Sequence, residues 1–143
     1  ACDVRIVAES ARMTAGYVRR GLSPDAGVSW LLPRHVGLAR ASDILLTGRD
    51  VDAVEAERIG LAAHVVADAT FAEGVRDYAS RLAAGPPLAQ ALTKRLLLRS
   101  LDTPLDSALR DELVYIKQCF ATRDVGEAIA AFREKRAPIF RGV

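Results

Sequence analysis

Strand-like segments occupy only the first half of this chain, and the second half is helical, which is the feature that most constrains its fold. Residues 3–9 alternate between apolar and polar side chains except at Val7, which is typical of a half-buried strand. Two further short β-rich segments cover residues 13–18 and 61–66. Because the one or two strands at the front of the chain do not make a stable sheet without several more, we expect the strands that pair with them in a segment upstream of Ala1.

The second half carries apolar residues at helical spacing, separated by glycine, proline and capping residues. The stripe that begins at Phe71 is typical, with apolar side chains at the fourth, seventh, eighth and eleventh positions after it. Four helices are therefore predicted, over residues 71–82, 88–101, 105–120 and 124–136. Strands at the front and helices at the back indicate an uneven α/β chain.

Capping residues and prolines set the predicted helix boundaries. Residues 52–55 and 124–127 each place Glu three positions after Asp, an acidic form of the capping box, and each is expected to open a helix. Residues 38–46 predict a helix that ends at a glycine. Pro33 is expected to limit how regular any helix around it can be.

Composition and charge exclude several classes of protein. The chain has 20 Lys and Arg against 18 Asp and Glu, mixed along its length, so no basic surface for nucleic acid is indicated. Cys2 and Cys119 lie far apart, with no Cys and His spacing typical of a zinc site or a disulfide framework. No window approaches the ~20 apolar residues of a membrane span. We therefore expect no metal, no membrane and a reducing, cytoplasmic environment.

The loop at residues 22–27, Leu-Ser-Pro-Asp-Ala-Gly, carries the most interesting carboxylate, Asp25. Its residues are also those of an ordinary turn, and Asp is a favoured N-cap for the helix that follows. From the residues alone, a helix cap is the favoured role of Asp25 and proton transfer is the alternative, and one loop can combine the two.

Five segments give the sequence a resemblance to the enoyl-CoA hydratase/isomerase (crotonase) superfamily. The resemblance extends over essentially the whole chain in the order found in that family. The segments are Leu22–Arg34, Val36–Arg40, Leu45–Arg49, Ala56–Val66 and Gly126–Arg141.

The resemblance implies a crotonase-like α/β fold, in which strand-strand-helix turns wind into a spiral that is followed by a helical region. Residues 1–66 then belong to the C-terminal portion of the spiral core, and residues 67–143 to the helical region for trimerisation and CoA contacts. Family members form homo-oligomers, namely trimers or dimers of trimers. About half of a family member, including both N–H donors of its oxyanion hole, is expected upstream of Ala1, so this chain alone is expected to be inactive.

The same resemblance implies a reaction. Hydratases of the family hold a water between two glutamates, and the position of the second is Tyr17 here, whose side chain has an ordinary pKa near ~10 and cannot serve as a carboxylate base. Asp25 matches the loop aspartate of some isomerase and dehalogenase members. The expected function is proton transfer on an acyl-CoA thioester, double-bond isomerisation, with Asp25 as the acid/base.

Other functions stay open beside isomerisation. A carboxylate upstream of Ala1 would make the protein an enoyl-CoA hydratase, and loss of part of the acid pair would make it a non-catalytic acyl-CoA-binding or assembly paralogue. A dehalogenase or thioesterase with Asp25 as nucleophile is less favoured, because no activating partner is evident. The coenzyme A thioester is the substrate in each case, and no separate cofactor is implied.

Four further residues are candidates for substrate binding. Tyr17 and Trp30 either line the acyl pocket or pack in the core. Phe132 and Lys135, at i and i+3 of the last predicted helix, match the aromatic and the lysine that contact the adenine and phosphates of CoA on a neighbouring subunit. The alternative for this second pair is a solvated, basic helix end.

Overall fold

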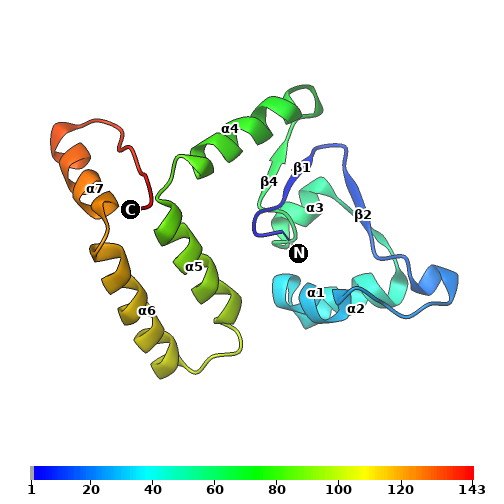
Figure 1. Ribbon diagram of the computed structural model, residues 1–143. Coiled ribbons are helices and arrows are strands. Elements are labelled where there is room, and N and C mark those ends of the chain that lie inside the picture. Colours follow the sequence, from blue (N-terminus) through cyan, green and yellow to red (C-terminus); the bar gives the residue numbers. More distant parts are fainter. Residues whose placement is uncertain (1) are drawn as a thin grey trace. The chain divides into compact units, whose positions relative to one another are not determined.

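The computed structural model describes residues 2–143, which form two compact units, the first ending at Asp77 and the second beginning at Tyr78 (Figure 1). Every strand within the described residues lies in the first unit, and the second is helical. None of the helices between residues 2 and 143 has both the length and the apolar character that crossing a membrane requires.

The elements of the first unit are short, and α4 continues from it into the second. In order they are β1 (Ile6–Ala8), β2 (Arg12–Thr14), η1 (Val18–Arg20), α1 (Val28–Val36), α2 (Leu38–Thr47), β3 (Asp50–Asp52), α3 (Ala53–Arg58), β4 (His64–Val66), η2 (Asp68–Thr70) and α4 (Phe71–Ala83). The second unit continues with α5 (Pro87–Arg99), α6 (Leu105–Phe120) and α7 (Arg123–Glu134).

Two pairs of strands organise the first unit. Strand β1 pairs in parallel with β4, with Ile6 opposite His64, and β2 pairs antiparallel with β3, with Met13 opposite Val51. The strand predicted at residues 3–9 is present in shorter form as β1, and β4 covers the second half of the β-rich segment at residues 61–66. Strand β2 overlaps the segment at residues 13–18 only in its first two residues, and β3 was not predicted.

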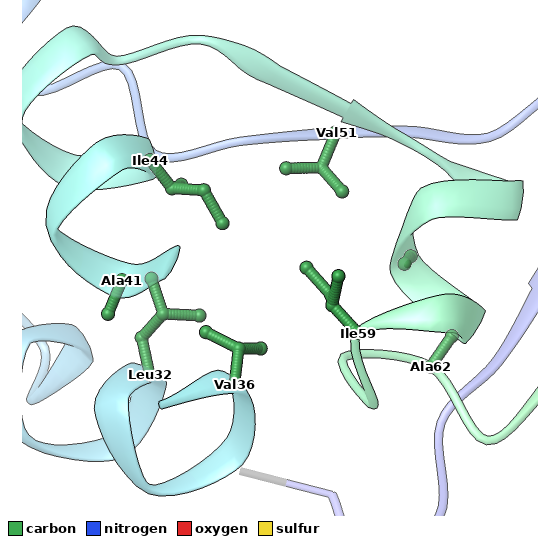
Figure 2. Packing of buried hydrophobic residues seen from close by; sticks show 8 residues of the cluster. Leu32, Val36, Ala41, Ile44, Val51, Ile59 and Ala62 are labelled. Carbon is green, nitrogen blue, oxygen red and sulfur yellow. The ribbon is translucent and has the colours of Figure 1, made fainter. Parts of the chain in front are cut away.

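The core of the first unit lies between α1, α2, β3 and α3 (Figure 2). Val51 at the centre of β3 is 1% exposed, and Ile44 and Ile59 point towards it from neighbouring elements. Burying a Val, Leu or Ile side chain contributes about 1.5–3 kcal/mol, so this cluster dominates the stability of the unit. Its members are Leu32, Val36, Ala41, Ile44, Val51, Ala56, Ile59 and Ala62.

Helix α1 runs unbroken through Pro33, so the expectation that this proline limits the helix is wrong. Proline removes the bond to the carbonyl four residues earlier and crowds it, at a cost of about 3 kcal/mol. Leu32 and Val36, on either side of the proline, are both buried in the core and offset that cost.

An ion-pair cluster connects α2, β3 and α3. Both terminal nitrogens of the Arg49 guanidinium bond the Glu55 carboxylate, at 2.7 and 2.8 Å, and its Nε bonds Asp43. Hydrogen bonds from Arg49 lower the pKa of Glu55. The Oδ1 of Asp52 accepts from the Glu55 amide at 2.8 Å, so the predicted cap of α3 is confirmed.

The prediction that residues 124–127 form a capping box at the start of a helix is wrong. Helix α7 begins after Thr122, and no side chain caps it. The Asp124 carboxylate is instead buried, 6% exposed, and accepts from the amides of Arg141 and Gly142 at 2.8 and 2.9 Å. We call residues 136–143, which these bonds hold against α7, the C-terminal strap.

Glu127 holds the strap at a second point. Its Oε1 accepts from the Ile139 amide at 2.9 Å, and both of its oxygens accept from the Arg136 guanidinium. The hydrogen bonds from Arg136, and to a smaller extent that from the Ile139 amide, lower the pKa of Glu127 to about 2. Two carboxylates on one face of α7 therefore fix the strap.

The loop between η1 and α1 contains left-handed backbone at Ala26, with φ 50°, and at Gly27, with φ 76°. Glycine adopts this conformation freely, but the Cβ of alanine makes it cost about 1–2 kcal/mol. Ala26 is thus a strained residue in an otherwise ordinary turn.

An Ala26→Gly variant of the full-length protein should be more stable by about 0.5–1 kcal/mol, because the strain relieved exceeds the entropy cost of glycine. Chemical unfolding measures the change. Ala39→Gly, at an exposed position in α2, is the matched control and should destabilise the protein by about 1 kcal/mol. Equal destabilisation by both changes would contradict the strain at Ala26.

A Glu127→Gln variant should lose stability at neutral pH and respond less to acid than the wild type. Since the folded pKa of about 2 lies below the ordinary 4.5, the contribution of Glu127 is complete above pH 4.5 and is lost as the pH falls towards 2. Unfolding of the full-length protein across this range measures it. Glu73→Gln, on exposed α4 surface, is the control, and identical acid profiles for wild type and E127Q would refute the strap contact.

Candidate functional site

Tyr17 and Asp25 lie at the two ends of the loop before α1 and contact each other. The Tyr17 carbonyl accepts from the amides of Arg20 and Leu22, at 2.9 and 3.1 Å, which turns the chain back on itself. The Tyr17 hydroxyl then donates to Oδ1 of Asp25 at 2.8 Å. Two residues that the sequence identified separately are therefore a hydrogen-bonded pair.

Asp25 does not cap α1. The N-cap of this helix is Gly27, and no side chain bonds the amides of the first turn. Asp25 contacts the helix only through its backbone carbonyl, which accepts a hydrogen bond from the Val28 amide at 3.1 Å. Within residues 2–143, Tyr17 is the side chain that hydrogen-bonds the exposed Asp25 carboxylate. Of the two roles that the sequence left open, the capping role is wrong.

The pair has a defined protonation pattern. The hydrogen bond to Asp25, then burial and the negative charge of Asp25, raise the pKa of Tyr17 above its ordinary value of 10.0. Tyr17 therefore stays protonated at neutral pH and acts as a hydrogen-bond donor. The two residues together offer one carboxylate and one phenol, which suits a site with a single carboxylate base.

The strained residue Ala26 follows Asp25 directly. Strained backbone persists only where the surrounding structure holds it in place, and it concentrates at functional sites. No sequence signal marks this strain, because alanine is common in turns. Its position next to Asp25 adds an independent reason to regard this loop as a site.

Trp30 lies on α1, just after the loop. Its side chain is 50% exposed, and the Arg34 guanidinium stacks over its ring at 3.6 Å from the ring centre. Trp30 does not belong to the buried core of the first unit, and its place in an acyl pocket stays a prediction. Arg34 was missed, although an arginine four positions after an aromatic residue on a helix indicates such a contact.

Phe132 and Lys135 belong to the second unit. Phe132 is 85% exposed on α7, so its ring is accessible to a ligand. The helix ends at Glu134, and Lys135 follows it with φ 55°, so the helical spacing assumed for the two residues does not extend to Lys135. Their contact with CoA stays a prediction. In the part of the chain that the structure describes, no three His, Cys, Asp or Glu side chains are grouped to hold a metal ion.

Comparisons with known proteins identify the family. The family model for enoyl-CoA hydratase/isomerase matches residues 1–143. A protein of Rhodobacter capsulatus named probable enoyl-CoA hydratase is 40% identical over 142 residues, which cover 99% of this chain and 55% of the relative. The chain thus spans about half the length of the curated relatives it matches.

Solved structures agree in fold. A probable enoyl-CoA hydratase/isomerase from Mycobacterium abscessus matches with TM-score 0.92 and 41% identity, over 99% of this chain and 55% of the other. An enoyl-CoA hydratase from Bacillus anthracis matches with TM-score 0.94 and 33% identity, over the same shares. The expected crotonase-like α/β fold is confirmed, and the chain belongs to the enoyl-CoA hydratase/isomerase family.

Proposed function

We propose that the full-length protein is an acyl-CoA enzyme that shifts a double bond by proton transfer on a CoA thioester, with Asp25 as the acid/base. The observation that carries this proposal is the contact of the Tyr17 hydroxyl with the Asp25 carboxylate at 2.8 Å. At the position where hydratases resembling this chain hold a second glutamate, this chain has a phenol that bonds Asp25.

Isomerisation needs one base that returns to the substrate the proton it has removed. Asp25 removes a proton from one carbon of the acyl chain, and the electron pair left behind spreads through the double bond onto the thioester oxygen. The same carboxyl group returns the proton two carbons away, so no atom is gained or lost. Backbone donors upstream of Ala1 would stabilise the charge on the thioester oxygen.

Two alternatives follow from the same family. Hydration adds a water across the double bond and, in this family, uses two carboxylates, so it requires a second one upstream of Ala1 because Tyr17 cannot supply it. A non-catalytic acyl-CoA-binding or assembly paralogue requires none. We expect no metal and no cofactor other than the CoA thioester itself, and a cytoplasmic location.

An Asp25→Asn variant of the full-length protein should lose about 10²- to 10⁴-fold in turnover, the usual contribution of a general acid/base, while still binding acyl-CoA. Turnover of a panel of enoyl-CoA thioesters measures this, and product mass separates an isomer from a hydrated product. Asp77→Asn, an exposed aspartate outside the loop, is the matched control.

Each outcome of this assay selects among the proposals. Full activity of D25N rules out Asp25 as the acid/base. A product heavier by one water assigns the protein to the hydratases. An absence of turnover by the wild type across the whole panel supports the binding paralogue instead.

We also propose that the full-length protein is a homotrimer or a dimer of trimers, in which residues 67–143 form the contacts between subunits and residues 1–66 complete the spiral core. An apolar stripe on α6 supports this, because every member is at least half exposed and falls at helical spacing along one face. The α6 stripe is Leu105, Leu109, Leu113, Ile116 and Phe120.

Leu109→Asp combined with Leu113→Asp should reduce the size of the assembly, since a charge in the α6 stripe must be buried when subunits meet. Sedimentation of the full-length protein measures the size. Gln118→Glu adds a charge to the opposite side of α6 and should leave the assembly intact. A monomeric wild type, or equal effects of both changes, would contradict this interface.

A further inference from the structure

The hydroxyl of Tyr17 forms a hydrogen bond that lining a pocket would not require. A phenol has one proton to donate, and here that proton goes to Oδ1 of Asp25 at 2.8 Å. We propose that Tyr17 is a positioning residue, which holds Oδ1 of Asp25 so that Oδ2 carries out the proton transfer. This inference rests on the proposed function and assigns Tyr17 a role that acts through Asp25.

The geometry of the loop fixes both partners of the pair. The Tyr17 backbone is held by the amides of Arg20 and Leu22, which bond its carbonyl. On the other side, the Asp25 carbonyl accepts from Val28 at the start of α1, and left-handed backbone follows at Ala26. With both backbones fixed, the bond between the side chains sets the rotation of the Asp25 carboxylate about its Cβ–Cγ bond.

Rotation of this carboxylate matters for the proposed reaction. One oxygen must reach two carbons of the same acyl chain in turn, so its direction has to be the same when it takes the proton and when it returns it. Correct orientation of a reacting group is worth large rate factors, and a displacement of about 1 Å costs on the order of 10²-fold. An exposed aspartate without such a contact turns freely.

The donor is present whenever the enzyme works. The hydrogen bond to Asp25 raises the pKa of Tyr17 above 10.0, so the phenol keeps its proton at neutral and mildly alkaline pH. The phenol therefore orients the carboxylate without competing with it for the substrate proton.

Tyr17→Phe in the full-length protein tests the inference, because it removes only the hydroxyl. We expect kcat to fall about 10- to 100-fold, the range for a lost hydrogen bond to a charged group, with KM changed by less than about twofold. In the Tyr17→Phe, Asp25→Asn double variant, no loss beyond that of D25N is expected, since Tyr17 acts through Asp25. Tyr115→Phe, which removes a hydroxyl from α6, is the matched control.

A second readout does not depend on activity. Ionisation of tyrosine changes its ultraviolet absorbance, and in the difference between the titrations of the wild type and D25N the signals of the other tyrosines cancel. In the Asp25→Asn variant, the pKa of Tyr17 should fall towards its ordinary value, because the bond to a charged carboxylate is gone. D25N keeps the tyrosine, so this test stands even where Y17F fails to fold.

The outcomes separate the inference from the proposed function. Normal kcat in Y17F beside an inactive D25N overturns the positioning role and leaves Asp25 as the base. Normal kcat in both variants means that the proposed function has failed. A double variant worse than D25N shows that Tyr17 acts independently of Asp25, and an unchanged Tyr17 titration in D25N shows that the contact is absent in solution. Either of these last two results also overturns the inference.

Discussion

The parallel pairing of β1 with β4 is the constraint on which the first unit depends. It joins the start of the unit to the strand that follows α3, so every helix of the core lies within the loop it closes. The Glu9 amide extends the ladder to the Val66 carbonyl, and the Arg5 guanidinium bonds the Leu61 carbonyl beside it. Closing a long chain loop costs little more entropy than closing a short one, so burial of the core side chains is enough to keep β1 and β4 paired.

The loop at residues 21–27, which carries Asp25, is anchored at both ends. Before it, β2 is held against β3, and η1 lies so close to α2 that a Cβ on Gly48 would meet the Val18 and Arg19 side chains at 3.1 Å. After it, α1 is anchored by Leu32 and Val36 in the core. An exposed loop between two anchored elements keeps the Tyr17 to Asp25 contact in place without being buried, and it leaves the Asp25 carboxylate accessible from solution.

Sequence patterns predicted the helices well, because periodicity is a local property, and they failed where a distant partner decides. Strand β3, Asp-Val-Asp, was missed because three residues with two aspartates carry no strand signal. The pattern Asp-x-x-Glu occurs at residues 52 and 124, yet only Asp52 caps a helix, since Asp124 binds the distant strap instead. Tyr17 and Asp25 were each identified through the resemblance, but their hydrogen bond needs the turn geometry that only the structure gives.

Stability alone does not explain the position of the Asp25 side chain. A capping aspartate at the start of α1 would stabilise the helix by about 1 kcal/mol, and the loop forgoes this contact. Left-handed backbone at Ala26 costs a further 1–2 kcal/mol or so. Two unfavourable features, a helix start without a side-chain cap and the strained backbone of Ala26, thus lie next to the Asp25 carboxylate. This carboxylate accepts a hydrogen bond from the Tyr17 hydroxyl instead. Local rules broken together at neighbouring residues are expected where geometry serves chemistry rather than folding, and this supports Asp25 as the reacting group.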